Sequence, residues 1–475
     1  MEHTAVLWFR NDLRLHDNEA LIEALSKTKY VLPVYVFDER VFLGKTRFGF
    51  EKTGKFRAKF IIEAVADLRE NLRQRGSDLI IRIGKPEEIV FDLAKSIKSS
   101  WVFCNRERTQ EEVEVQDKLE HNLWSIGQEL RFSRGKMLYH TADLPFPVSQ
   151  VPDIFSNFRK EIENIVDVRF PYDTPKTIGF PAFKENRGEV PTLRTFDKNE
   201  VDTLHIENER FIGGETRALL HLRKYIWDDQ YVGNYKDTRN EMFGWNFSSK
   251  FSAWLSAGCI SPKLIYHELK EYEKKVKKND STYWMFFELL WRDFFRLMGK
   301  KHGNKIFHKS GIRGINPGGD KDLVLFHSWA SGNTGWPLID ANMRQLNQTG
   351  FMSNRGRQNV ASFLIKDMNI NWLLGAEYFE SMLIDYDPCS NYCNWNYIAG
   401  IGCDPREDRY FNIISQSKKY DPHGEFIRYW IPELKNISNH FIHYPEEMTM
   451  DEQTKSGVII GKNYPLSVIP QKNLV

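Results

Sequence analysis

The chain places a carboxylate, an indole and a guanidinium on one face of a predicted helix. Trp291 and Arg292 follow Glu288 by three and four residues, within a stretch (281–299) whose apolar residues recur at helical spacing. Burying the two charged groups among aromatic rings costs free energy unless they pair or face a cavity. Two interpretations stay open: a structural ion pair at the helix rim, or an aromatic cavity that holds a flat heterocycle.

A second group of polar residues lies between Phe351 and Asn359, where the chain enters an apolar helical stretch. Polar side chains in such a place need partners inside the protein or a ligand. Further on, Asp385 and Asp387 stand two residues apart, directly before a proline. Two close carboxylates suit a divalent cation or an acid/base pair, whereas an Asp-Pro turn needs no ligand. Further ligands for a cation are not evident, and Arg357 would satisfy one carboxylate without a metal.

Five cysteines is an odd number for a chain of 475 residues, which favours reduced thiols and a cytoplasmic location. Cys389, Cys393 and Cys403 lie close together, but the nearest histidine, His423, is distant in sequence. A zinc or iron–sulfur site would need a fourth ligand. We therefore expect buried thiols and no metal. No targeting segment precedes the first strand pattern.

The overall charge limits how the protein can bind a polyanion. Lys plus Arg number 66 and Asp plus Glu number 64, so the net charge is only +2. Any polyanion partner must therefore be held by a local patch and not by the overall charge. The stretch 296–316 carries six cations and no acidic residue, and is either a phosphate-tracking surface or a solvated basic face. No apolar run approaches the ~18 residues of a membrane span, so we expect no membrane association.

The first 135 residues alternate short β-rich runs with amphipathic runs, which predicts a doubly wound, parallel, Rossmann-like α/β domain. The expected strands cover residues 5–9, 31–37, 79–83, 101–105 and 129–133. Neither a GxGxxG nor a Walker A motif follows the first strand, so pattern alone leaves the ligand of this domain undetermined. Residues 136–204 form the predicted connector, and residues 205–475 form the predicted all-α domain.

The helical half holds ten of the 13 tryptophans, between Trp227 and Trp430. This concentration indicates either a large helical core or chemistry that uses aromatic rings. The spacing of apolar residues predicts helices over 281–299, 341–369 and 371–384. By topology alone, a nucleotide-binding stress protein fused to a helical domain is one open function class.

Taken in order, these features resemble the photolyase/cryptochrome family from Ala5 to about Leu434. The motifs that carry the resemblance are VLWFRNDLRLHDNEAL, Tyr235, the SSKFS run 248–252, ELLWRDFFR from Glu288, TGWPLIDANMRQLNQTGFMSNRGRQNVASFL from Thr334 and the stretch 383–404. MSNRGRQNVASF, NYCNWNY and YDPHGEFIRYWIPEL are similar to the cryptochrome DASH branch. The resemblance implies an N-terminal α/β antenna domain and a C-terminal helical domain that holds FAD.

The resemblance also implies which residues hold cofactors. FAD would be bound by Tyr235, Ser248, Ser249, Lys250, Phe251, Ser252, Asn354, Arg357, Asp385, Asp387 and Asn391. Tyr235 and the segment 248–252 would hold the flavin phosphates, Arg357 and Asp385 would form a buried pair, and Asn391 would lie near flavin N5. A second chromophore, 5,10-methenyltetrahydrofolate, would lie between the domains, with Glu107 as the expected contact.

The reaction that the resemblance implies is light-driven electron transfer from reduced FAD to a cyclobutane pyrimidine dimer, which is flipped out of the DNA strand. Glu288 would hydrogen-bond the dimer, Trp291 and Tyr397 would form apolar walls, and Arg239 and Arg355 would lie near the DNA backbone. Tyr397 and Gln358 stand where enzymes for duplex DNA typically carry Trp and Met. A more polar pocket recovers less of the flipping cost, which favours single-stranded DNA. A blue-light photoreceptor that retains DNA binding is the alternative.

The family's electron chain from surface to flavin uses three tryptophans, and this sequence departs from it. Trp395 and Trp372 match the proximal and middle positions. The distal position falls near residues 317–320, which have the sequence Pro-Gly-Gly-Asp. Trp329, Trp336 or a tyrosine would have to take its place. We expect a monomer that binds damaged DNA through a basic rim around one cavity.

Overall fold

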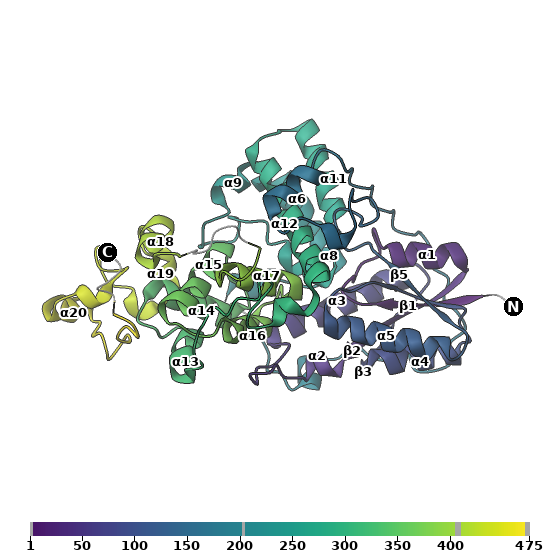
Figure 1. Cartoon of the computed structure of the whole chain (residues 1–475), viewed down its shortest axis with the longest axis horizontal. Coiled ribbons are helices and arrows are strands. Elements are labelled where there is room, and N and C mark those ends of the chain that lie inside the picture. Colours follow the sequence, from purple (N-terminus) through teal and green to yellow (C-terminus); the bar gives the residue numbers. More distant parts are fainter. Residues whose placement is uncertain (1–2, 202–204, 404–409, 471–475) are drawn as a thin grey trace.

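Five strands form one parallel sheet in the N-terminal α/β body (Figure 1). In the computed structural model, which describes residues 3–201, 205–403 and 410–470, the strands are β1 (Thr4–Phe9), β2 (Tyr30–Asp38), β3 (Ile80–Gly84), β4 (Trp101–Asn105) and β5 (Glu129–Ser133). Their spatial order is β3-β2-β1-β4-β5, and all neighbouring pairs are parallel. The predicted doubly wound sheet is confirmed.

Alternate residues of β1 face two different cores. Ala5, Leu7 and Phe9 belong to a large core that continues into the helical body, whereas Val6 and Trp8 belong to a smaller one. The large core includes residues of α1 (Glu19–Lys27), α2 (Glu39–Phe42) and α3 (Lys55–Arg73), and the smaller core includes residues of α4 (Pro86–Ser96) and α5 (Gln110–Trp124). Burial on both faces explains why the strands are nearly continuous apolar runs.

The carboxyl edge of this sheet is docked on the helical body. The strand order reverses between β1 and β4, where doubly wound folds form a crevice. After β1 the chain turns against the helical body: the Leu13 amide donates to the Ala257 carbonyl (3.2 Å) and the Arg14 guanidinium to the Gly258 carbonyl (2.9 Å). The crevice therefore becomes part of the contact between the two bodies.

The predicted connector runs along both bodies with little regular structure. It contains a 3-10 turn (Val148–Gln150), α6 (Phe155–Ile162) and a second 3-10 turn (Leu193–Phe196). Phe155 and Phe158 of α6 pack on Phe294, while the Gly179 carbonyl accepts a hydrogen bond from Val31 at the start of β2. These contacts tie the segment to both bodies. The residue boundaries of the two domains stay predictions.

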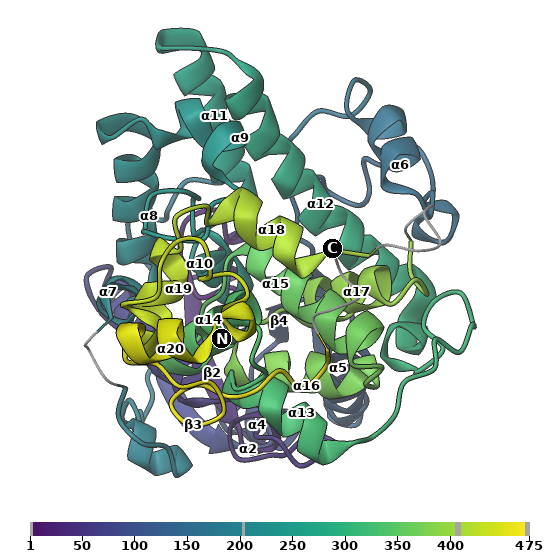
Figure 2. The ribbon, with the colours of Figure 1, turned by 90° about the vertical axis from the view of Figure 1, so that its left-hand side faces the viewer.

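The helical body, seen from its own end in Figure 2, is built around one long helix, α12 (Asp280–His302). The other α-helices of this body are α7 (Ile206–Arg210), α8 (Glu215–Arg223), α9 (Tyr235–Thr238), α10 (Ser252–Ala257), α11 (Pro262–Lys275), α13 (Leu323–Ser331), α14 (Pro337–Thr349), α15 (Asn354–Ser362), α16 (Trp372–Met382), α17 (Pro388–Ile398), α18 (Ile413–Tyr420), α19 (Glu425–Trp430) and α20 (Met450–Ser456). Short π-helical segments cover Lys224–Asp228 and Phe363–Asp367, and 3-10 turns cover Tyr231–Asn234, Gly303–Phe307, Pro432–Leu434 and Pro445–Glu447.

Local signals explain where α12 begins and ends. The Asn279 side chain accepts hydrogen bonds from the Ser281 and Thr282 amides in a capping box, and Asp280 lies in the positively polarised first turn. Lys300 and Lys301 lie in the last turn, where cations are favoured. The helix therefore extends beyond the predicted range 281–299 at both ends.

The prediction of one continuous helix over 341–369 is wrong. Helix α14 ends at Thr349 because Gly350 takes a left-handed conformation (φ 69°), and α15 starts at Asn354, where the Ser353 hydroxyl accepts from the Gly356 amide (3.0 Å). Apolar periodicity on both sides of the break masked it. The break matters, because it gives the polar residues of α15 a new direction.

Two further findings concern the described part of the chain. None of its helices combines the length and the apolar character that a membrane crossing requires. All five cysteines lie within it, and each is a free thiol, as expected.

Candidate cofactor pocket and substrate-facing residues

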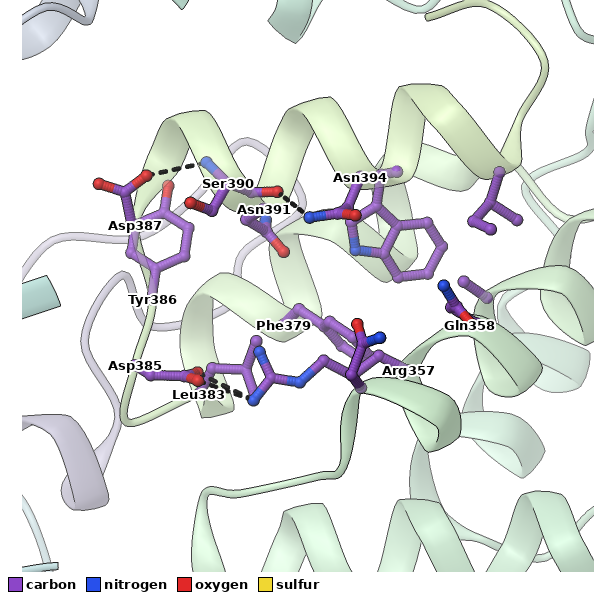
Figure 3. Close-up of a pocket in the computed structure, with 14 residues that line it drawn as sticks. Arg357, Gln358, Phe379, Leu383, Asp385, Tyr386, Asp387, Ser390, Asn391 and Asn394 are labelled. Carbon is purple, nitrogen blue, oxygen red and sulfur yellow. Dashed lines mark hydrogen bonds and ion pairs between the residues drawn. The ribbon is translucent and has the colours of Figure 1, made fainter. Parts of the chain in front are cut away.

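A pocket opens between α15, α16 and α17 in the helical body (Figure 3). It encloses about 580 Å³ of unfilled space, including its mouth. Its lining includes Asn354, Arg357, Gln358, Asp385, Asp387 and Asn391, all residues named from the sequence. The turn at Gly350 and the loop before α17 bring these polar groups together, with Phe379 and Trp395 as apolar walls.

An ion pair spans one side of the pocket. The Arg357 guanidinium donates from Nη2 to both oxygens of Asp385, at 3.0 and 2.9 Å, and from Nε to the Met352 carbonyl at 2.9 Å. The expected Arg357–Asp385 pair is therefore present. Its three hydrogen bonds fix the guanidinium plane, as a bidentate pair does, so a rigid charged group faces the pocket.

Asp387 joins the pocket to the α/β body through buried charges. Its carboxylate caps α17 by accepting from the Ser390 amide (2.8 Å) and pairs with Arg296 of α12 (2.9 Å). Burial alone would raise the pKa of Asp387, but the guanidinium groups of Arg296 and Arg292 outweigh it and lower that pKa. Arg296 also reaches Glu107, at 3.4 Å.

Glu107, the expected antenna contact, is buried at this junction. Its carboxylate pairs with the Lys136 ammonium and accepts from the Asn11 amide (3.3 Å). Burial would raise the pKa of Glu107, but Lys136 and Arg296 outweigh it and bring that pKa down to about 2. Lys136, Glu107, Arg296 and Asp387 thus form one buried chain of alternating charges. The role of Glu107 toward an antenna stays a prediction.

Asn391 and Trp395 lie one turn apart on α17, on the pocket wall. The Asn391 amide donates to the Ala376 carbonyl of α16 (3.0 Å), which anchors the side chain while it lines the pocket. The Trp395 ring packs edge-on against Phe379, with centroids 5.2 Å apart. A methyl group on Gly375 would lie 2.3 Å from Cη2 of Trp395, so that glycine makes room for the ring.

The segment 248–252 presents a buried cation. The Lys250 ammonium donates to the Ser248 hydroxyl (3.1 Å), and the side chain is 3% exposed. Within the described residues, no carboxylate lies within ion-pair distance of it, and burial lowers the pKa of Lys250. Tyr235, also buried, begins α9, while the His221 ring donates to the Ser249 carbonyl (2.7 Å). A buried ammonium beside a hydroxyl fits an anionic group such as a phosphate.

The residues expected to face substrate gather around α9, α12 and α17. Arg239 pairs with Glu288 at 2.6 Å, and burial raises the pKa of Glu288 against the effect of that guanidinium. The rings of Trp291 and Tyr397 meet edge to face, with centroids 6.2 Å apart. Arg355 donates to the Asn240 side chain (2.9 Å), so it lies on the same rim as Arg239. The far face of Trp291 is stacked on Phe155 of α6 at 3.7 Å, a contact that the sequence did not indicate.

The basic stretch 296–316 does not form one surface patch. Arg296 is buried, and the Lys301 ammonium binds Asp153 (2.9 Å) and the Val151 carbonyl (2.7 Å). These two cations therefore have partners inside the protein, whereas Lys300, Lys305 and Arg313 are exposed, so both interpretations of the stretch stay open. Sequence proximity alone could not reveal these partners.

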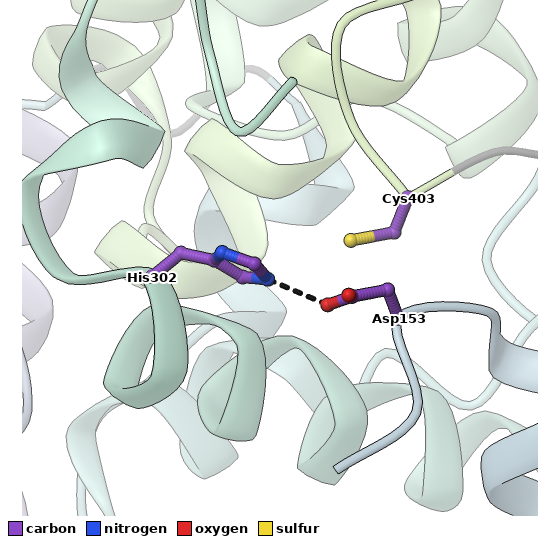
Figure 4. Close-up of side chains that lie close together, drawn as sticks. All are labelled: Asp153, His302 and Cys403. Atoms are coloured by element: carbon purple, nitrogen blue, oxygen red, sulfur yellow. Dashed lines mark hydrogen bonds and ion pairs between the residues drawn. The ribbon is translucent and has the colours of Figure 1, made fainter. Parts of the chain in front are cut away.

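Cys403 has different neighbours from those considered in the sequence. Its thiol lies near the Asp153 carboxylate and the His302 ring, with the three ligand-type atoms within 4.8 Å of one another (Figure 4). His302 Nε2 contacts Asp153 Oδ1 at 2.6 Å, and Lys301 contacts the same oxygen at 2.9 Å. Because an ammonium already occupies that carboxylate oxygen, we assign the cluster to hydrogen bonding between α12 and the connector.

Trp372, the expected middle electron carrier, is buried at the start of α16. It is 1% exposed, and its indole N–H donates to the Lys309 carbonyl (3.0 Å). The segment 317–320 runs beside it: Asp320 bridges to Ile370, and a methyl on Gly319 would lie 2.8 Å from the Asn371 amide. The stretch in which a distal tryptophan was expected thus contributes backbone and no ring. The sequence did not single out Tyr392, whose ring lies 6.2 Å from Trp372.

Taken together, these features define a two-domain protein in which a parallel α/β sheet is docked on a helical body with a charged cofactor pocket. Residues 5–176 match the family model "DNA photolyase", and residues 284–474 match "FAD binding domain of DNA photolyase". The chain belongs to the photolyase/cryptochrome family, and its helical domain is an FAD-binding domain of the photolyase type.

Individual relatives place the chain close to the cryptochrome DASH branch. It is 46% identical to "Cryptochrome DASH" of Gloeobacter violaceus, over 98% of this chain and 93% of that protein. The solved structure of a Synechocystis cryptochrome has a TM-score of 0.95 and 46% identity, covering 100% of this chain and 99% of that one. A class III photolyase from Agrobacterium tumefaciens has a TM-score of 0.86 and 29% identity, covering 100% and 96%.

Proposed function

We propose that this protein repairs cyclobutane pyrimidine dimers in single-stranded or loop-exposed DNA, driven by light and reduced FAD. The observation that carries the proposal is the corner formed by α12 and α17. There the rings of Trp291 and Tyr397 meet 6.2 Å apart, with Glu288 one turn away on α12. The same α17 carries Asn391 on the pocket wall. An aromatic corner beside a carboxylate suits two adjacent, hydrogen-bonding pyrimidine rings of one strand.

FAD, when bound, reduced and excited by light, supplies the electron that splits the dimer and receives it back. The pocket residues hold and orient it. Lys250 and Ser248 would hold its phosphates, while Arg357, fixed by Asp385, and Asp387 would hold its ring system. Because the electron returns, the chain needs no acid/base triad for the overall reaction.

The substrate-facing residues bind and select the lesion. Glu288 hydrogen-bonds the dimer, and Arg239 leaves that carboxylate to contact the DNA backbone together with Arg355. Each base stacked on an aromatic ring contributes about 1–3 kcal/mol. Flipping a dimer out of a duplex costs a few kcal/mol, and the polar Tyr397 and Gln358 recover less of it than larger apolar groups. The pocket therefore favours lesions that are already unpaired.

The same proposal includes a second chromophore and a cellular setting. We place 5,10-methenyltetrahydrofolate between the two domains near Glu107, where the buried charge chain meets the carboxyl edge of the sheet. We also propose a cytoplasmic monomer. Five free thiols support a reducing compartment. Three plant relatives are named "Cryptochrome DASH, chloroplastic/mitochondrial", which makes an organelle the alternative to the cytoplasm.

The test is illumination of the protein with chemically reduced flavin and an oligonucleotide that contains one dimer, either single-stranded or in a duplex. We expect dimer loss in the single strand and much less in the duplex. Glu288→Gln should slow the loss by about 10- to 100-fold, the equivalent of a lost hydrogen bond to a charged group. Glu271→Gln, on the exposed face of α11, should not. No dimer loss in either DNA would contradict repair and leave the photoreceptor alternative.

A further inference from the structure

By family resemblance, three tryptophans carry electrons between the surface and the flavin. This chain has Trp395 and Trp372 at two of these positions and no tryptophan at the third, near residues 317–320. Trp372 is 1% exposed, and its indole N–H is bound to the backbone carbonyl of Lys309 rather than packed against another indole. The family's chain would continue to a further indole here, and none lies beside Trp372 in the described residues. The hole that reaches Trp372 therefore needs a further carrier among the neighbouring side chains.

Tyr392 lies in the position that such a carrier requires. Its ring centroid is 6.2 Å from that of Trp372, and no other ring in the described part of the chain lies as near to Trp372. On its other side, 4.6 Å away, is the half-buried Phe307 of the surface turn 303–307. Tyr392 itself is 3% exposed, so its ring is held in place by packing.

The hydroxyl group of Tyr392 has a base. It donates to Oε2 of Glu380 on α16 at 3.1 Å, within the reach required for proton transfer. Burial raises the pKa of Glu380, against the effect of Arg57 of α3, whose guanidinium donates to the Glu380 backbone carbonyl at 2.6 Å. A phenol gives up an electron far more easily when its proton can move to such a partner. By contrast, the Trp372 N–H is bound to a carbonyl, which does not accept a proton, so its hole remains a strong oxidant.

A different tyrosine, Tyr378, is connected to Trp395 through ring contacts. Trp329 lies 6.4 Å from Trp395, and Tyr378 lies 6.0 Å from Trp329. However, the Tyr378 hydroxyl donates to the Asn347 amide oxygen at 2.6 Å and to the Ala330 carbonyl at 3.1 Å. Neither oxygen is a base, so this branch has no place for the phenolic proton.

We propose that Tyr392 is the terminal electron donor of the chain and that Glu380 accepts its proton. Light-excited oxidised flavin is the oxidant, and it takes one electron from Trp395. Trp395 is refilled from Trp372, and Trp372 from Tyr392. Tyr392 loses one electron to Trp372 and its phenolic proton to Glu380, which leaves a neutral tyrosyl radical and a protonated carboxyl group. This inference rests on the proposed binding of FAD in the pocket of Figure 3.

Flash illumination of the flavin-loaded protein tests the assignment. Transient absorption and EPR should detect a neutral tyrosyl radical that outlives the tryptophan radicals. Tyr392→Phe should abolish this signal and leave a short-lived tryptophan radical, and Glu380→Gln, which keeps a hydrogen-bonding side chain without a base, should do the same. Tyr378→Phe is the matched control and should retain the signal.

Persistence of the tyrosyl radical in Tyr392→Phe, or its loss in Tyr378→Phe, overturns Tyr392 as the donor. Persistence in Glu380→Gln overturns Glu380 as the proton acceptor.

The same variants separate this inference from the proposed repair function. With flavin reduced chemically beforehand, Tyr392→Phe and Glu380→Gln should repair single-stranded dimers at the wild-type rate, because the terminal donor is then unnecessary. A normal flavin spectrum in each variant shows that the pocket is folded. Loss of repair in the prereduced variants, with that spectrum intact, would overturn the restriction of Tyr392 and Glu380 to photoreduction. Failure of the wild type to repair would count against the proposed function alone.

Discussion

Buried charges in the helical body fall into two kinds, those with a partner of opposite charge and those without. Arg357 and Arg296 have carboxylate partners at about hydrogen-bond distance, so each is accounted for by the protein itself. Lys250 is equally buried but contacts a hydroxyl and aromatic rings. The centroid of the Phe247 ring lies 3.2 Å from its ammonium nitrogen. An uncompensated buried charge is costly, so a bound anion would relieve a strain that the ligand-free fold carries.

Replacing Lys250 should therefore preserve or raise the stability of the apoprotein but weaken the binding of FAD. In Lys250→Met we expect the apoprotein to unfold at an equal or higher temperature, because the buried charge is gone. FAD should bind about 10- to 100-fold more weakly, because a charge-assisted hydrogen bond of ~1.5–3 kcal/mol is lost. Differential scanning fluorimetry and flavin titration measure the two effects. Lys236→Met, on an exposed ion pair with Asp280, is the control. Unchanged FAD affinity in Lys250→Met would show that no anionic part of the ligand reaches this site.

At the scale of elements, the approach of α16 and α17 determines where the Trp395 ring lies. Gly375 is the contact point, since a methyl group there would lie 2.3 Å from Trp395 Cη2 and 2.6 Å from Leu364 Cδ2. Both distances are too short for carbon atoms, so the helices or the ring would have to move. The glycine thus links helix packing to the wall of the cofactor pocket.

Gly375→Ala should destabilise the protein by about 1–3 kcal/mol, the usual cost of overpacking, although alanine normally favours a helix. The displaced indole should also slow photoreduction of bound flavin. In a Trp395→Phe background the smaller ring removes Cη2, so adding Gly375→Ala should cost much less. Chemical denaturation of the four proteins gives the coupling energy. Equal costs in both backgrounds would mean that Trp395 is not what the added methyl meets.

The segment 248–252 is attached to α8 by a hydrogen bond between His221 and the Ser249 carbonyl. Burial, together with the nearby Lys250 and Arg210 cations, lowers the pKa of His221 from 6.5 to about 4, so the folded protein holds it neutral while its N–H donates to the Ser249 carbonyl. The unfolded chain takes up this proton near pH 6.5. The stability contribution is therefore complete above pH 6.5 and is lost as the pH falls toward 4.

Flavin should consequently be released from the wild type as the pH falls through that window, which the fluorescence of free flavin reports. His221→Gln, whose amide donates without titrating, should retain flavin to lower pH. His443→Gln, which replaces a histidine bound to Ser417, should follow the wild type. If His221→Gln released flavin at the same pH as the wild type, another group would control the segment.

Some elements of this fold are encoded locally and others are not. The five strands and α12 are marked by apolar runs, caps and helical spacing, which is why their positions could be predicted from the sequence. The break at Gly350 lies between two stretches of the same periodicity, and only its left-handed backbone reveals it. Family motifs indicated several of the residues that line the pocket. The pairing of Tyr392 with Glu380 joins two helices by packing alone, so no sequence pattern marks it.

At the scale of the whole molecule, one core and one charge chain join the two bodies. The large core includes Phe9 of the sheet and Trp395 of the pocket wall. The charge chain runs from Lys136 through Glu107 and Arg296 to Asp387, which lines the pocket. Glu107 at the domain junction is therefore two ion pairs away from Asp387 on the pocket wall.

Glu107→Gln is the sharpest test of this connection. The pKa of Glu107 is lowered from 4.5 to about 2, since Lys136 and Arg296 outweigh the effect of burial. Its ionised form therefore stabilises the fold fully above pH 4.5, and this contribution is lost as the pH falls toward 2. At pH 7 the variant leaves a buried ammonium and a guanidinium without their shared carboxylate, which should cost about 3–5 kcal/mol.

The loss should be visible as a lower unfolding midpoint in urea at pH 7. It should also appear as a weaker dependence of that midpoint on pH between 4.5 and 2 than in the wild type. Because Arg296 is then held by Asp387 alone, flavin affinity and the flavin absorption spectrum should change as well, although residue 107 lies outside the pocket. Glu111 of α5 is an exposed partner of Lys52, and Glu111→Gln should change the free energy of unfolding by less than about 0.5 kcal/mol. A Glu107→Gln protein as stable as Glu111→Gln, with an unaltered flavin spectrum, would mean that the charge chain does not connect the two bodies energetically.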